Sequence, residues 1–161
     1  MEIAFFTPEI RNANVADSEA IAALLRESFA EFEPLYTPEA LAATTPSSQQ
    51  IRMRFEEGPV WVAVLGGAIV GTVSVVPQGE ALYIRSMAVH PSARGKGVAG
   101  RLLTAVERYA SAQGCERLFL STTPFLTDAI RLYEHAGFTR IAEGLSHLFG
   151  TPLFTMEKRL T

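Results

Sequence analysis

Apolar residues recur with two different spacings in the first part of this chain, and these spacings predict a strand followed by helices. The alternating stretch 9–14 is expected to form a short first strand. Asp17 is suited to cap the start of a helix. The predicted inner face of that helix consists of Ile21, Leu24, Leu25, Ser28 and Phe29. Pro34 and Pro38 are expected to interrupt helical structure, and a second helix is predicted over 47–57.

The middle of the chain is predicted to form three consecutive strands. Residues 60–65 are a continuous apolar run, as in a buried strand. The Gly66-Gly67 pair that follows is a strong signal for a two-residue hairpin, because glycine accepts the positive φ angles that such turns need. The second strand is expected over 69–76. A turn at 77–79 then leads into a third strand over 81–89.

The last part of the chain alternates between helical and extended patterns. A period of 3.6 begins at Val98, and Gly114 is suited to the position just after the end of that helix. The remaining predicted elements are a strand at 118–120, a helix at 126–136, and two paired strands at 138–143 and 153–158. The element order predicts a mixed α/β fold in which helices cover a mixed sheet.

Length and charge exclude several classes of protein. The 161 residues fit one domain, expected to span 1–161, and the net charge of −3 argues against nucleic acid as a partner. No stretch of about 18 apolar residues predicts a membrane span. The N-terminus lacks the basic segment of a signal peptide, so a cytoplasmic location is expected. The three histidines and the single cysteine lack metal-ligand spacing, so no metal is expected.

The segment 94–100 carries the clearest chemical signal. It reads Arg-Gly-Lys-Gly-Val-Ala-Gly and joins the strand predicted at 81–89 to the helix that begins at Val98. Glycines let backbone N–H groups approach a ligand closely, and the start of a helix adds free N–H groups and the positive end of its dipole. Arg94 and Lys96 add positive charge. The segment is therefore expected to bind a diphosphate.

Three kinds of diphosphate ligand were weighed for this loop. A nucleoside triphosphate site requires Ser or Thr after the lysine, and here Gly97 follows Lys96. The dinucleotide pattern Gly-x-Gly-x-x-Gly is nearly met at 95–100. However, the next predicted strand, 118–120, is not followed by the acidic residue that would hold a ribose. The third ligand is the pyrophosphate of coenzyme A.

Two segments of the chain resemble motifs of the GNAT N-acetyltransferase superfamily. Residues 94–99 fit the acyl-CoA loop pattern Arg/Gln-x-x-Gly-x-Gly/Ala. Residues 129–138 resemble the second motif, a helix that carries Leu-Tyr-Glu and ends in Gly-Phe. The resemblance covers nearly the whole chain. It implies an acetyl-CoA-dependent N-acyltransferase whose mixed α/β fold has a mostly antiparallel twisted sheet, flanked by helices, with a splayed central strand pair.

The resemblance also implies where coenzyme A binds. The pantetheine arm is expected in the gap beside the strand 81–89, and the pyrophosphate on the amides of the glycine loop. The expected coenzyme-binding residues are Met87, Ala88, Val89, Arg94, Gly95, Lys96, Gly97, Val98, Ala99, Gly100, Thr127 and Tyr133. This chain has Leu126 where many members carry an Asn that contacts pantetheine. Thr127 or Thr123 is expected to replace that contact.

Two residues are assigned to proton transfer by the same resemblance. Tyr133 matches the tyrosine that protonates the departing thiolate in many members, and a phenol with an ordinary pKa of about 10 carries its proton at neutral pH. The alternative is a ring that only packs in the core. Glu80 is the candidate general base, because the strand 81–89 lacks the Glu that relatives often place there. A water chain or an already deprotonated amine would make a dedicated base unnecessary.

The acceptor is expected to be the primary amine of a small molecule, which attacks the thioester directly from the opposite side of the sheet. Its binding wall is expected in the first helix and the following loop, at Phe29, Phe32, Leu35 and Tyr36, where ordinary packing is the alternative role. Two other functions stay open: a catalytically silent acyl-CoA sensor or scaffold, and acetylation of protein N-termini or lysines. Exposed sheet edges make a homodimer an expected assembly.

Overall fold

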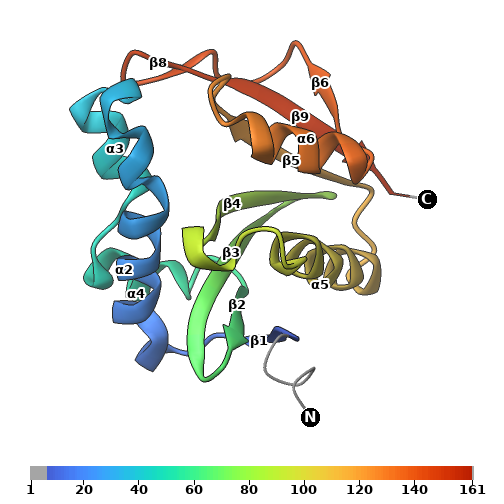
Figure 1. Cartoon of the computed structure of the whole chain (residues 1–161). Coiled ribbons are helices and arrows are strands. Elements are labelled where there is room, and N and C mark those ends of the chain that lie inside the picture. Colours follow the sequence, from blue (N-terminus) through green and yellow to red (C-terminus); the bar gives the residue numbers. More distant parts are fainter. Residues whose placement is uncertain (1–6, 161) are drawn as a thin grey trace.

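The computed structural model describes residues 7–160, and its centre is a seven-stranded sheet in the order β1-β2-β3-β4-β5-β9-β6 (Figure 1). The strands are β1 (Glu9–Asn12), β2 (Val60–Leu65), β3 (Ala68–Gln78), β4 (Ala81–Val89), β5 (Arg117–Thr122), β6 (Thr139–Ile141) and β9 (Phe154–Arg159). Every neighbouring pair is antiparallel except β4 and β5, so the predicted mixed, mostly antiparallel sheet is confirmed. The edges are β1 and β6, and the homodimer stays a prediction.

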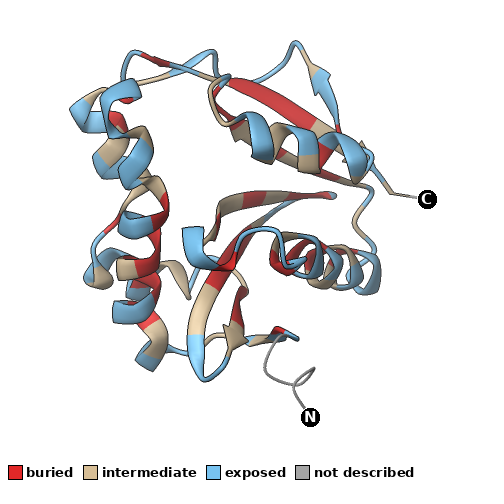
Figure 2. Ribbon diagram, viewed as in Figure 1, coloured by how far each residue is buried: buried red, intermediate tan, exposed pale blue. Residues whose placement is uncertain are grey.

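Helices cover both faces of this sheet. They are η1 (Val15–Asp17), α2 (Ser18–Phe29), η2 (Ala30–Leu35), α3 (Pro38–Thr44), α4 (Ser48–Arg54), η3 (Pro91–Ala93), α5 (Val98–Ala112) and α6 (Thr127–His135). Helices α2 and α4 share one buried cluster with β2 and β4, while α5 and α6 share the other with the centre of the sheet (Figures 1 and 2). A small hairpin, β7 (His147–Leu148) and β8 (Thr151–Pro152), precedes β9. No helix in residues 7–160 has the length and apolar character that crossing a membrane requires.

The central strands β4 and β5 pair over a very short distance. Their parallel ladder joins only Ala81–Tyr83 of β4 to Arg117–Phe119 of β5, although β4 continues to Val89 and β5 to Thr122. Beyond Tyr83 the two strands separate, as the ribbon shows (Figure 1). The splayed central pair that the family resemblance implies is therefore present.

A β-bulge shapes β4 just after this point of separation. Thr72 of β3 pairs with Ala88, and Ser74 pairs with Arg85, so two residues of β4 lie opposite one residue of β3. The first of these two, Ser86, has a φ of 55°, which is uncommon for a residue with a side chain. Because the extra residue shifts the alternation, Arg85 and Ala88 lie on the same face of the sheet, towards α2 and α4.

Three local predictions were wrong. Pro38 does not interrupt a helix but begins α3 as its first residue, where the missing N–H costs nothing, and Thr37 caps this helix by accepting from the Ala40 N–H. The helix predicted over 47–57 is shorter, ending at Arg54 as α4. The turn predicted at 77–79 is displaced, because Pro77 and Gln78 still pair with β4.

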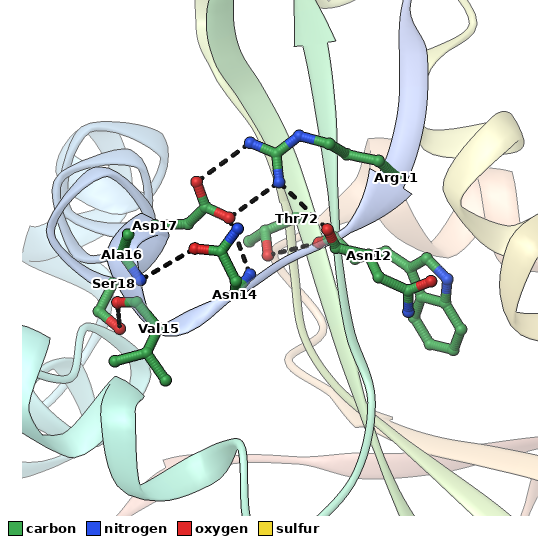
Figure 3. A network of polar contacts seen from close by, with 9 residues as sticks. Arg11, Asn12, Asn14, Val15, Ala16, Asp17, Ser18 and Thr72 are labelled. Carbon is green, nitrogen blue, oxygen red and sulfur yellow. Dashed lines mark hydrogen bonds and ion pairs between the residues drawn. The ribbon is translucent and has the colours of Figure 1, made fainter.

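Asp17 has a different role from the predicted cap of α2. Its side chain makes no capping hydrogen bond to α2. Asn14 caps η1 instead, and the Asp17 carboxylate accepts from the Asn14 backbone N–H and from both terminal nitrogens of Arg11 (Figure 3). These hydrogen bonds lower the pKa of Asp17 below its ordinary value. The network therefore fixes β1 to the start of the helical layer.

Helix α5 depends on close contact with the sheet at Gly71 of β3. A Cβ at this position would lie 2.8 Å from Cγ1 of Val98 and 3.1 Å from Cδ1 of Leu102, so Gly71→Ala overpacks the interface between helix and sheet. We expect a loss of about 1–3 kcal/mol in the free energy of unfolding, measured by urea denaturation. Gly100→Ala is the control, because its Cβ meets nothing within 4 Å and alanine favours helix. Equal stability of the two variants would contradict this packing.

Candidate active site

A cavity of about 590 Å³ lies where β4 leaves β5. Its walls come from the end of β4, the loop that follows, the start of α5, the end of α2 with η2, and the start of α6. The predicted coenzyme-binding residues among its lining are Met87, Ala88, Val89, Arg94, Gly95, Gly97, Val98, Ala99, Gly100, Thr127 and Tyr133. Residues from five separate parts of the chain thus meet at one cavity of a size typical for small ligands.

The loop before α5 presents a row of free backbone donors to this cavity. Gly95 and Gly97 have φ angles of 78° and 79°, a conformation that glycine adopts without strain. Among residues 7–160, no partner accepts a hydrogen bond from any backbone N–H between Gly95 and Gly100. The 15-residue helix α5 begins at Val98 and directs the positive end of its dipole to the same place. These groups fit a diphosphate such as that of coenzyme A.

The open edge of β4 supplies further backbone groups. The His90 N–H donates to the Val70 carbonyl of β3 at 2.8 Å. Because consecutive residues of a strand alternate in direction, the N–H and C=O of Val89 point the other way, into the gap between β4 and β5. Unpaired main-chain groups in such a gap require a partner. The amides of a pantetheine arm have the matching donors and acceptors.

Tyr133 of α6 lies at the inner end of the cavity. Its side chain is 7% exposed and its ring packs against Phe138, with 5.8 Å between the ring centroids. Burial raises the pKa of the Tyr133 phenol to about 12. No residue between 7 and 160 forms a hydrogen bond with its hydroxyl, although the side chain lines the cavity. The hydroxyl is therefore available to a ligand and keeps its proton at neutral pH.

The two cations of the glycine loop lie differently. Arg94 lines the cavity, but its guanidinium forms an ion pair with Glu31 of η2 and donates to the Ser28 carbonyl at 3.2 Å. Lys96 is exposed and is not part of the cavity lining. The loop is thus tied to the end of the first helix through Arg94, and the donors that face the cavity are mainly backbone N–H groups.

Glu80 is not brought to this cavity. It lies at the tip of the hairpin between β3 and β4, where its carbonyl accepts from the Glu116 N–H at 2.7 Å. Met87, which lines the cavity, is seven residues further along an extended strand, a separation of roughly 20 Å. This geometry argues against direct proton transfer from an amine in the cavity to the Glu80 carboxylate.

The predicted acceptor wall is partly assembled. Phe29 and Phe32 line the cavity, whereas Leu35 is 55% exposed. Tyr36 is buried edge-on against Phe125, with 4.9 Å between the centroids. Phe125 lines the cavity and was missed by sequence reasoning. Its only signal is an apolar residue placed in the loop between β5 and α6.

The histidines take part in local polar contacts. His90 accepts from the Ser92 N–H and its Nε2 lies 2.9 Å from the Glu27 carboxylate, while His135 contacts the Arg131 carbonyl of its own helix. In the described residues 7–160, no three His, Cys, Asp or Glu side chains gather into a group that would hold a metal ion.

Comparison with known proteins identifies the family. The model of the acetyltransferase (GNAT) family matches residues 19–138, which include the whole cavity lining except for no residue beyond Tyr133. The chain belongs to the GNAT acetyltransferase family. The uncharacterized N-acetyltransferase YjgM of Escherichia coli (strain K12) is 30% identical over 141 residues, which are 84% of each chain. The uncharacterized N-acetyltransferase YhfO of Bacillus subtilis (strain 168) is 30% identical over 135 residues, 80% of this chain and 88% of that protein.

A solved GNAT structure shares the fold. The PaiA N-acetyltransferase of Thermoplasma acidophilum, solved in complex with coenzyme A, superposes with a TM-score of 0.82 at 18% identity, over 96% of this chain and 99% of that one. The resemblance seen in the two sequence motifs is therefore confirmed, together with the enzyme class, an acetyl-CoA-dependent N-acyltransferase. The roles of individual residues stay predictions.

The glycine loop of this GNAT enzyme is open to a matched test. Gly97 and Gly114 flank the two ends of α5 with φ angles of 79° and 73°, and a Cβ on either meets nothing within 4 Å. Alanine at either position is strained by about 1 kcal/mol or more. Only Gly97→Ala is expected to weaken coenzyme A binding, by severalfold in Kd, because its strain displaces the free N–H groups.

Titration calorimetry with coenzyme A checks this expectation, with urea unfolding to compare the stability lost by the two variants. An equal rise in Kd for Gly97→Ala and Gly114→Ala would mean that the loop has no direct part in binding.

Proposed function

We propose that this enzyme transfers the acetyl group of acetyl-CoA to the primary amine of a small molecule by direct attack. The amine nitrogen bonds to the thioester carbonyl carbon, the carbon–sulfur bond breaks, and one proton from nitrogen ends on the coenzyme A sulfur. The observation that carries this proposal is a single cavity that joins the free N–H groups of residues 95–100 to the unpartnered hydroxyl of Tyr133. The coenzyme A complex of the PaiA enzyme supports the same donor.

Tyr133 acts as the proton donor in this proposal. A thiolate leaves with a negative charge on sulfur, and a neutral phenol beside it stabilises that charge by hydrogen bonding and then protonates it. Burial keeps the phenol protonated, since its pKa is raised to about 12. Packing against Phe138 restricts the ring, so the hydroxyl is positioned before the substrate arrives.

The amine enters as the free base in this proposal. The carboxylates that line the cavity are Glu31 and Asp128. Glu31 is occupied by Arg94, and the Asp128 side chain is almost fully exposed beside Arg131. With Glu80 at the far end of β4, the enzyme gains most by binding an amine that solvent has already deprotonated. Its contribution to rate is then orientation and stabilisation of the leaving group.

Tyr133→Phe removes the hydroxyl while keeping the ring. We expect kcat to fall by about 10²-fold, the lower end of the usual contribution of a general acid, with the KM for acetyl-CoA nearly unchanged. Release of coenzyme A with a turned-over amine is the measurement. Tyr109→Phe is the matched control, because Tyr109 is a half-buried tyrosine that packs on Trp61 outside the cavity. An unchanged kcat in Tyr133→Phe would remove the proton-donor role, and tight coenzyme A binding without turnover of any amine would favour the silent sensor.

The pH profile has a definite sign. A phenol with its pKa raised to about 12 stays protonated through the whole range from pH 6 to pH 10, so Tyr133 causes no loss of activity there. The free-base fraction of the amine increases with pH, so kcat/KM is expected to rise towards the pKa of the amine and then level off. A fall in rate with an apparent pKa between 8 and 10 would contradict this account.

A further inference from the structure

Arg85 of β4 has two buried donors without partners. Its Nη1 forms an ion pair with Glu57 at 2.9 Å. Its Nε and Nη2 are shielded from solvent, and within the described residues neither has a hydrogen-bond partner. Buried polar groups are nearly always hydrogen-bonded, and a charged group left unpaired is costly. These two nitrogens form one edge of the guanidinium, the fork of parallel N–H groups that binds a carboxylate through both oxygens.

A second arginine increases the positive charge at this place. Arg54, the last residue of α4, donates from Nη1 to the hydroxyl of Ser86 at 2.6 Å. Burial, followed by repulsion from Arg85, lowers the pKa of Arg54 to about 10. Two guanidinium groups therefore face one carboxylate, Glu57. The local excess of positive charge makes an anionic ligand favourable here.

The arginine pair lies beside the reaction cavity but on the other face of the sheet. Ser86, which Arg54 contacts, is followed directly by Met87 of the cavity lining. Leu82 and Ile84 of β4 belong to the core under α5, so the alternation of the strand directs Arg85 towards α4. A ligand at the arginine pair is therefore within roughly 7 Å along β4 of the place where the coenzyme arm is proposed to end.

From this arrangement we infer that Arg85, assisted by Arg54, binds a carboxylate carried by the acceptor amine. This inference rests on the proposed function, since it assigns the acceptor class of the same site. Amino acids are the simplest molecules with an amine and a carboxylate this close together. The fork is covered, but Glu57 on the opposite edge is 45% exposed, so the guanidinium lies near solvent and a small rotation presents the fork to a ligand.

The test compares amines that differ only in the carboxylate. A panel of L-amino acids and the corresponding carboxamides is assayed by coenzyme A release, with kcat/KM expressed per free base. We expect the wild-type enzyme to prefer the carboxylate by about tenfold or more, as for a hydrogen bond to a charged group. Arg85→Gln is expected to abolish this preference. Arg85→Lys is expected to lose most of it, because an ammonium group has no planar fork.

Arg54→Met is expected to weaken the preference, and Arg52→Met is its matched control on the same helix, where Arg52 is exposed. The KM for acetyl-CoA reports on folding and is expected to stay constant in all variants. Equal use of acids and amides by the wild-type enzyme would overturn the carboxylate site and leave the proposed function standing. So would an unchanged preference in Arg85→Gln.

If no amine is acetylated, the proposed function fails, and the carboxylate site is then judged by binding. Calorimetry with an N-acetylated amino acid and its amide, in the presence of coenzyme A, supports the site if only the acid binds and Arg85→Gln abolishes that binding. Absence of carboxylate-dependent binding overturns it.

Discussion

The short ladder between β4 and β5 is the constraint on which the rest of this enzyme depends. Only three residue pairs join these strands, and the β-bulge at Ser86 follows at once. If the ladder continued, the N–H and C=O of Val89 would be satisfied within the sheet. Because it ends early, the sheet keeps a gap lined by main-chain groups that need partners. An acyl-CoA arm fits this need, so the fold itself favours the donor.

Three structural layers meet at the gap with very different strength. Helix α5 is fixed by fully buried residues such as Leu102 and Val106, so the start of the helix and its loop are held rigidly. The wall formed by α2 and η2 is joined to that loop by the exposed pair Arg94–Glu31, which contributes little to stability. The coenzyme side is thus built on the core. The acceptor side is built on weaker surface contacts, where substrate preference changes at low cost to folding.

Sequence patterns predicted the parts of the fold that depend on local chemistry. The Gly66-Gly67 hairpin, helix α5 and the glycine loop all follow from residue type and spacing. What failed depends on contacts that a sequence does not display. Pro38 starts a helix because Thr37 caps it, and Glu80 lies far from the cavity because Pro77 and Gln78 extend β3. The arginine pair was missed for the same reason, since Arg54 and Arg85 are distant in sequence and meet only after folding.

The most direct test of the central claim is a crystal structure of the protein with coenzyme A bound. The account predicts the pyrophosphate within hydrogen-bond distance of the backbone N–H groups of residues 95–100. It also predicts the pantetheine arm against Val89 and the sulfur near the Tyr133 hydroxyl. A coenzyme bound elsewhere, or a sulfur remote from Tyr133, would contradict it.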